Sequence, residues 1–119
     1  TLRQYPNVVG VYATCARHTR SLLKALEQTK IPLQAAIGSE LFEESYQALQ
    51  NGRLDAVIDK RPELIGYDAL RLIFANLVKK EKLPISHRVT PRIVLRANSE
   101  ICYLAKEEEN YYGKDSDFE

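Results

Sequence analysis

The sequence contains no methionine or tryptophan, only two cysteines, and five glycines that do not cluster. It has no run of about 18 uncharged apolar residues, the length that a membrane-spanning helix needs, and its start does not resemble a signal peptide. Two distant cysteines cannot build a disulfide framework, so we expect a reduced, cytoplasmic setting. Because the initiator methionine is also absent, we interpret the chain as a piece of a longer protein, about one domain in size.

Sequence motifs for catalysis and phosphate binding are missing as well. We find no Cys-x-x-Cys, His-Glu-x-x-His, Gly-x-Ser-x-Gly, P-loop or Gly-x-Gly-x-x-Gly pattern. Cys15 and His18 are three residues apart, a spacing compatible with a reactive thiolate at a helix start or with half a metal site. No second pair accompanies them. We therefore expect an ordinary thiol, no metal, no cofactor and no catalysis, with a Cys15-based enzyme as the alternative.

Charge is nearly balanced, with 17 basic and 16 acidic side chains. Basic residues are scattered among acidic ones rather than gathered on one face, which argues against direct contact with nucleic acid. Residues 106–119 are different, because they hold two lysines and six acidic residues. We expect residues 1–105 to form the domain and residues 106–119 to be a flexible acidic tail or a frayed helix. The run Glu107–Glu109 could alternatively bind cations or a basic partner, and Tyr111-Tyr112 could anchor an interface.

Hydrophobic patterning predicts strands that alternate with helices. Short apolar runs predict strands at residues 8–14, 33–38, 54–59 and 92–97. Helical spacing predicts helices at residues 17–28, from a Ser39 cap to Asn51-Gly52, and from Pro62 to about Lys80. The third helix should bury one apolar face: Ile65, Ala69, Leu72, Ile73 and Leu77. This β-α-β-α-β-α-β order predicts an α/β fold with a parallel sheet in a three-layer α/β/α arrangement.

Ligands of open parallel sheets bind at the carboxyl ends of the strands. The residues that follow the first three predicted strands are Thr14–Arg17, Ser39-Glu40 and Asp59–Arg61. They bring cations, carboxylates, hydroxyls and a thiol to one rim, which suits a small polar ligand. Loop polarity and helix capping would explain the same residues without a ligand, so this rim is a candidate site only.

Four segments, which cover about residues 5–100, together resemble a known family. They read VVGVYATCAR, AAIGSE, ALQNGRLDAVIDKRPELIGYDALRLIFANL and TPRIVLRANSE. This succession resembles the C-terminal part of the effector-sensing domain of LacI-type transcriptional regulators, and also the related ribose-type periplasmic sugar-binding proteins. The most distinctive part is NG-x-LDAVID-x-x-P-x-x-x-GY-x-AL. The resemblance implies one lobe of a type I periplasmic-binding-protein-like fold.

The resemblance also implies the position of a ligand. Cys15, Arg17, Glu40 and Lys60 are the ligand-binding residues that it suggests. The family's Asn-Asp after the first strand reads Cys15-Ala16 here, its later Asp is matched by Glu40, and its Gln is replaced by Lys60. A cation at Lys60 beside Arg17 and Arg61 would suit an acidic or phosphorylated sugar.

The function that this resemblance implies is effector sensing, in the cytoplasm, by a homodimeric regulator. Closure of two lobes on a sugar or an acidic derivative would change how a separate N-terminal domain meets operator DNA. The alternatives are a periplasmic sugar-binding protein of a transporter and a receptor lobe fused to a signalling kinase. Taken alone, the piece should leave a free sheet edge that is prone to pairing.

Overall fold

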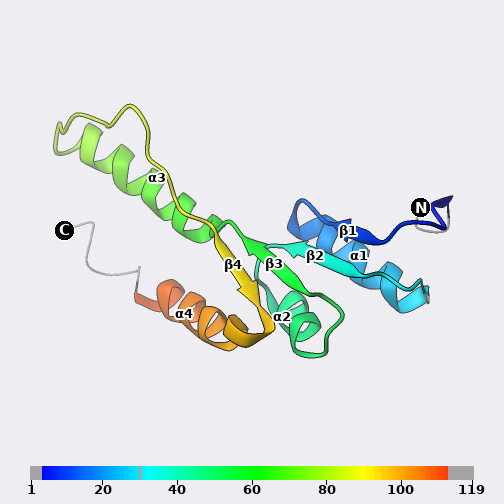
Figure 1. Ribbon diagram of the computed structural model, residues 1–119. Coiled ribbons are helices and arrows are strands. Elements are labelled where there is room, and N and C mark those ends of the chain that lie inside the picture. Colours follow the sequence, from blue (N-terminus) through cyan, green and yellow to red (C-terminus); the bar gives the residue numbers. More distant parts are fainter. Residues whose placement is uncertain (1–3, 30, 113–119) are drawn as a thin grey trace.

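The computed structural model describes residues 4–29 and 31–112. Strands and helices alternate through the first two-thirds of this region, as the sequence predicts, and the fold is α/β (Figure 1). The elements are β1 (Gly10–Tyr12), α1 (Ala16–Gln28), β2 (Ala35–Ser39), α2 (Glu43–Gln50), β3 (Ala56–Asp59), α3 (Pro62–Leu77), β4 (Arg92–Leu95), a 3-10 turn η2 (Arg96–Asn98) and α4 (Ser99–Tyr112).

The four strands form one mixed sheet in the order β1-β2-β3-β4. β1, β2 and β3 are parallel, as predicted, and Val11 lies opposite Ala36 while Gly38 lies opposite Val57. β4 runs antiparallel to β3, with Val57 opposite Val94. The expectation of an entirely parallel sheet was therefore wrong for the last strand. The reason is that α3 does not pack back across the sheet as a crossover helix would, so the chain returns from the far end of α3 and enters β4 in the opposite direction.

Three helices cover one face of the sheet. α1 packs beside α2 and α2 beside α4, while each of them contacts a strand beneath it. The core between these layers consists of small and aliphatic side chains: Ala13, Leu22, Leu23, Ala36, Leu41, Ala48, Leu49, Leu54, Val57 and Val94. The opposite face also carries apolar side chains, and Tyr12, Ile93 and Leu95 are exposed there. The described residues therefore form two layers, where the sequence analysis expected three.

Helix α3 projects away from the sheet (Figure 1). None of its residues is buried. Ile73 and Leu77, which were predicted to face a core, are 51% and 63% exposed. The prediction of a helix was correct, and so was Pro62 in its first turn. The prediction of its burial was wrong for the described residues, because an apolar stripe shows that a helix packs on something but does not show on what.

Local signals at helix ends were partly predictive. Gly52 has a φ of 74°, the left-handed conformation expected just after α2. Ser39, however, does not cap α2, because it is the last residue of β2. The helix begins four residues later, where the backbone N–H of Phe42 donates to Ser45 Oγ at 2.9 Å. Ser45 Oγ also donates to the carbonyl of Glu40.

Helix α4 extends into the segment that was expected to be an acidic tail. Tyr103 stacks on Tyr46 of α2 with ring centroids 4.6 Å apart. Lys106 Nζ donates to the Leu41 carbonyl and lies 2.9 Å from Glu63 Oε1. The helix thus continues to Tyr112, with contacts described as far as Lys106, and residues 113–119 lie outside the described part of the chain.

The close approach of α1 to β2 depends on Gly38. A Cβ atom at this position would lie 2.9 Å from Thr19 Cγ2 and 3.1 Å from Leu54 Cδ1. Thr19 is β-branched and buried, so it has little freedom to move away. We expect Gly38→Ala to lower the free energy of unfolding by about 1–3 kcal/mol, measured by urea denaturation. Gly10→Ala, whose Cβ would make only ordinary contacts, is the control. An equal loss in both variants would contradict this explanation.

Candidate functional site

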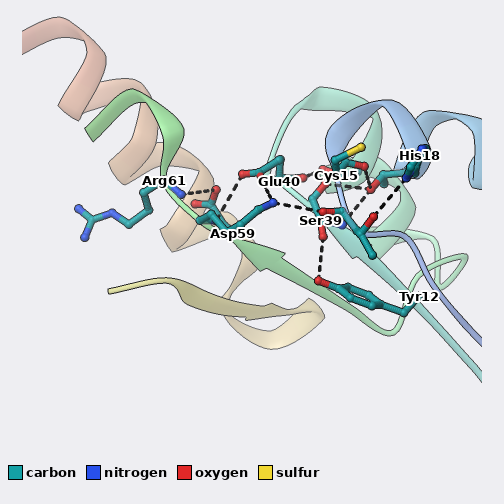
Figure 2. Close-up of polar contacts among 11 residues, drawn as sticks. Tyr12, Cys15, His18, Ser39, Glu40, Asp59 and Arg61 are labelled. Carbon is teal, nitrogen blue, oxygen red and sulfur yellow. Dashed lines mark hydrogen bonds and ion pairs between the residues drawn. The ribbon is translucent and has the colours of Figure 1, made fainter. Parts of the chain in front are cut away.

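The carboxyl ends of β1, β2 and β3 meet at one edge of the sheet, because these strands are parallel. This edge carries the three segments that the sequence singled out: 14–17, 39–40 and 59–61. β4 is antiparallel, so its first residue, Arg92, lies at the same edge. Figure 2 shows polar contacts at this edge, with Cys15, Ser39, Glu40, Asp59 and Arg61 labelled among the residues drawn. Lys60 contacts both Thr14 and Glu40 here, and we call these three residues the strand-end cluster.

Glu40 and Lys60 form an ion pair at this edge. Lys60 Nζ lies 2.9 Å from Glu40 Oε1, and the backbone N–H of Lys60 donates to Glu40 Oε2 at 3.3 Å. Lys60 Nζ also donates to the Thr14 carbonyl at 3.2 Å. One lysine therefore joins the ends of all three parallel strands. Both charged residues are predicted ligand contacts, and the structure brings them together at the predicted edge.

The backbone at Glu40 adopts a conformation that non-glycine residues rarely use. Its φ is 68°, in the left-handed region, and its N–H donates to the Ile58 carbonyl at 3.0 Å. Arg61, just after Lys60, has a φ of 57°. Such conformations cost on the order of 1 kcal/mol or more each and concentrate at functional sites. One of these residues is thus a member of the ion pair and the other directly follows its partner, while Lys80, beyond the end of α3, has a similar φ of 58° away from this edge.

The ion pair also changes the titration of Lys60. The hydrogen bond that Lys60 donates to Glu40 raises the pKa of Lys60 above its ordinary value, partial desolvation opposes this effect, and the charge of Glu40 adds to the rise. Tyr12 and Cys15 contribute smaller effects in the same direction. Lys60 is therefore a cation at neutral pH, and Glu40 balances its charge.

Tyr12 belongs to this edge although the sequence analysis did not name it. Ser39 Oγ donates to Tyr12 Oη at 3.2 Å, on the sheet face opposite the three helices α1, α2 and α4. Its position as the last residue of β1 was the available signal, because alternation along the strand places it opposite Ile37 and away from the core residue Ala36. The phenol adds an aromatic surface beside the polar groups.

Cys15 and Arg17 lie at the start of α1. Cys15 is the residue before the helix, and its carbonyl accepts hydrogen bonds from the backbone and the side chain of Thr19. Its thiol is half-buried. Arg17 is exposed on the first turn. His18 Nδ1 lies 3.2 Å from Thr14 Oγ1, so the hydrogen bond of its ring is to a hydroxyl rather than to the Cys15 thiol. Within residues 4–29 and 31–112, no cluster of three His, Cys, Asp or Glu side chains has the geometry for a metal ion.

Asp59 has a structural partner instead of facing a ligand. Its carboxylate is fully buried and lies 3.0 Å from Arg92 Nη2. Asp59 Oδ1 also accepts the backbone N–H of Arg61 at 3.3 Å. The Arg61 side chain points away from Glu40 (Figure 2). The expected group of cations at Lys60, Arg17 and Arg61 is therefore not assembled as a single positive patch: Lys60 is balanced by Glu40, and Arg61 is directed elsewhere.

No helix in the described residues is long and apolar enough to cross a lipid bilayer. The sequence matches no known protein-family model and no curated protein. Solved structures, in contrast, match the fold over most of the chain, at identities of 17–23%. At this level the likeness establishes the fold alone.

Three of these structures come from binding proteins and a regulator. GanP, a glucose-galactose binding protein from Geobacillus stearothermophilus, is 23% identical with a TM-score of 0.68, over 82% of this chain and 35% of that one. A periplasmic solute-binding protein of an ABC transporter from Actinobacillus succinogenes, solved with D-allose, is 18% identical with a TM-score of 0.71, over 84% and 35%. A candidate LacI transcriptional regulator from Bacteroides fragilis is 17% identical with a TM-score of 0.72, over 84% and 34%. The chain thus spans about a third of the length of each.

Proposed function

We propose that this chain is part of a sugar-binding module, that the module binds its ligand at the strand-end cluster, and that it performs no catalysis. The observation that carries the proposal is the position of the Glu40–Lys60 ion pair at the carboxyl ends of three parallel strands. Open α/β sheets bind ligands at this edge. The likeness of the fold to a glucose-galactose binding protein and to a D-allose-bound receptor supports a sugar as the ligand.

We also propose that a second lobe of the natural protein covers α3. Leu70, Ile73 and Leu77 are spaced at helical intervals along α3, and all three are more than half exposed. Isolated apolar side chains on a surface are common, but a continuous stripe usually marks a contact. The similar structures are about three times as long as the part that matches. A second lobe on α3 would face the strand-end cluster across a cleft that starts at the turn from β3 to α3.

Within this class, we favour a LacI-type transcriptional regulator. The likeness to a candidate regulator from Bacteroides fragilis supports this choice, together with the resemblance of residues 5–100. The regulator would be a cytoplasmic homodimer whose separate N-terminal domain binds operator DNA. The second candidate is a periplasmic sugar-binding protein of an ABC transporter, which the likeness to the transporter receptor supports equally.

Binding by the natural full-length protein tests the first proposal. We expect isothermal titration to detect saturable binding of D-glucose, D-galactose or D-allose, and Lys60→Ala to weaken it by about tenfold or more, because a charged hydrogen bond contributes roughly 1.5–3 kcal/mol. Lys24→Ala, at an exposed position of α1, should bind like the wild type. Equal affinities of the two variants would remove Lys60 from the site.

The two candidate functions separate in a DNA-binding assay. A regulator should bind a two-fold operator as a dimer, and sugar should change that affinity. A transport receptor should bind the same sugar and leave DNA unbound. Fluorescence anisotropy with genomic DNA fragments from upstream of its own gene, with and without sugar, distinguishes these outcomes.

A further inference from the structure

The hydrogen-bond donors of Lys60 in the strand-end cluster bear on the charge of the ligand that the site accepts. An ammonium group has three N–H donors. Lys60 uses two of them on its own chain, one toward Glu40 Oε1 and one toward the Thr14 carbonyl. The Lys60 side chain is 45% exposed, so its third donor is accessible to a ligand. Lys60 is thereby held in place as a donor.

Glu40 complements this donor. Its carboxylate can accept about four hydrogen bonds, and the side chain and backbone of Lys60 supply two. The Glu40 side chain is only 14% exposed. An exposed donor and an adjacent acceptor with spare capacity match two neighbouring hydroxyl groups, because one hydroxyl can accept from Lys60 while the other donates to Glu40.

We propose that the Glu40–Lys60 ion pair makes the site selective for uncharged, polyhydroxylated ligands and excludes anionic sugars such as uronates and sugar phosphates. This inference rests on the proposed function and specifies its ligand class. An anion that accepts the third donor of Lys60 would stand close to the Glu40 carboxylate and share one cation with it. The two negative charges would repel each other at this partly desolvated edge, whereas a neutral hydroxyl group at the same donor brings no second charge.

The surrounding cations do not offset the repulsion between Glu40 and an anionic ligand. Arg61 directs its side chain away from Glu40 (Figure 2), and Arg17 is exposed to solvent on α1, where its charge is screened. Asp59, the other acid at this edge, is already matched by Arg92. The charges of Glu40 and Lys60 thus offset each other at this edge of the sheet.

The test compares neutral and anionic sugars on the natural full-length protein by isothermal titration. Neutral ligands are D-glucose, D-galactose and D-allose, and anionic ligands are D-glucuronate, D-galacturonate and D-glucose 6-phosphate. We expect the wild type to bind its best neutral sugar at least about tenfold more tightly than any anionic one. Glu40→Gln, which leaves the Lys60 charge unbalanced, should move this ratio toward anions by about tenfold. Lys60→Gln should move it further toward neutral sugars.

A matched control is Glu44→Gln, which removes the same charge from an exposed ion pair with Arg20 on the helices and should leave the ratio unchanged. If Glu40→Gln does not fold, the opposite shift in Lys60→Gln carries the test. Two results would overturn this inference and leave the proposed function intact. In the first, neutral sugars bind but the ratio of neutral to anionic affinity is unchanged in both variants. In the second, the wild type prefers an anionic sugar. A wild type that binds no sugar of either class would overturn the proposed function and the inference with it.

Discussion

Replacing Arg92 with methionine is expected to lower the free energy of unfolding by about 3–5 kcal/mol, because it leaves a buried carboxylate without its cation. Asp59 is fully buried, and Arg92 Nη2 lies 3.0 Å from its Oδ2. Methionine preserves much of the apolar stem of the arginine, so the loss reports on charge rather than on packing. Urea denaturation of the natural protein, followed by circular dichroism, measures it.

Two further variants separate the charge effect from other causes. Adding Asp59→Asn to Arg92→Met should recover most of the loss, because the neutral amide needs no counterion and keeps an oxygen for the Arg61 N–H. Arg96→Met, at an exposed position in the turn after β4, should change the stability by less than about 0.5 kcal/mol. If the double variant is as unstable as Arg92→Met alone, the ion pair is not the cause.

Replacing Thr19 with valine is expected to cost about 2–6 kcal/mol, because it leaves two buried backbone groups without a partner, at roughly 1–3 kcal/mol each. Thr19 Oγ1 accepts the Ser39 N–H at 2.8 Å and donates to the Ser39 carbonyl at 2.9 Å. Both residues are fully buried. The substitution nearly preserves shape, so the lost hydrogen bonds dominate. Thermal unfolding and urea denaturation measure the change.

The conservative variant Thr19→Ser keeps the hydroxyl and loses one buried methyl group, so it should cost only about 1 kcal/mol. Because Ser39 directly precedes Glu40, Thr19→Val should also disturb the strand-end cluster and weaken sugar binding, whereas Thr19→Ser should not. A serine variant as unstable as the valine variant would show that packing, rather than hydrogen bonding, fixes the end of β2.

Much of the fold was predictable from local signals. Apolar runs located β1, β2 and β3, and Gly52 marked the end of α2. The errors concern long-range placement. The apolar stripe on α3 predicted burial, but no residue of this helix is buried among the described residues. The direction of β4 followed from where α3 goes, and local patterning holds no information about that.

The candidate site was predictable in part, because the order of strands and helices predicts which residues lie at the carboxyl ends of the strands. Strand polarity placed Glu40 and Lys60 at one edge, and they form an ion pair there. The role of the Thr14 carbonyl was not predictable, because every residue has a carbonyl and only the tertiary structure brings this one to Lys60. Asp59 directly precedes Lys60 at the end of the same strand. Its burial beside Arg92 nevertheless makes it part of a structural ion pair rather than a predicted ligand contact.

The most direct test of the account is a crystal structure of the natural full-length protein with its neutral sugar bound. We expect the sugar at the carboxyl ends of β1, β2 and β3, with one hydroxyl accepting from Lys60 Nζ, a second donating to Glu40, and a second lobe against α3. A sugar bound elsewhere on the protein, with the Glu40–Lys60 pair facing only solvent, would contradict it.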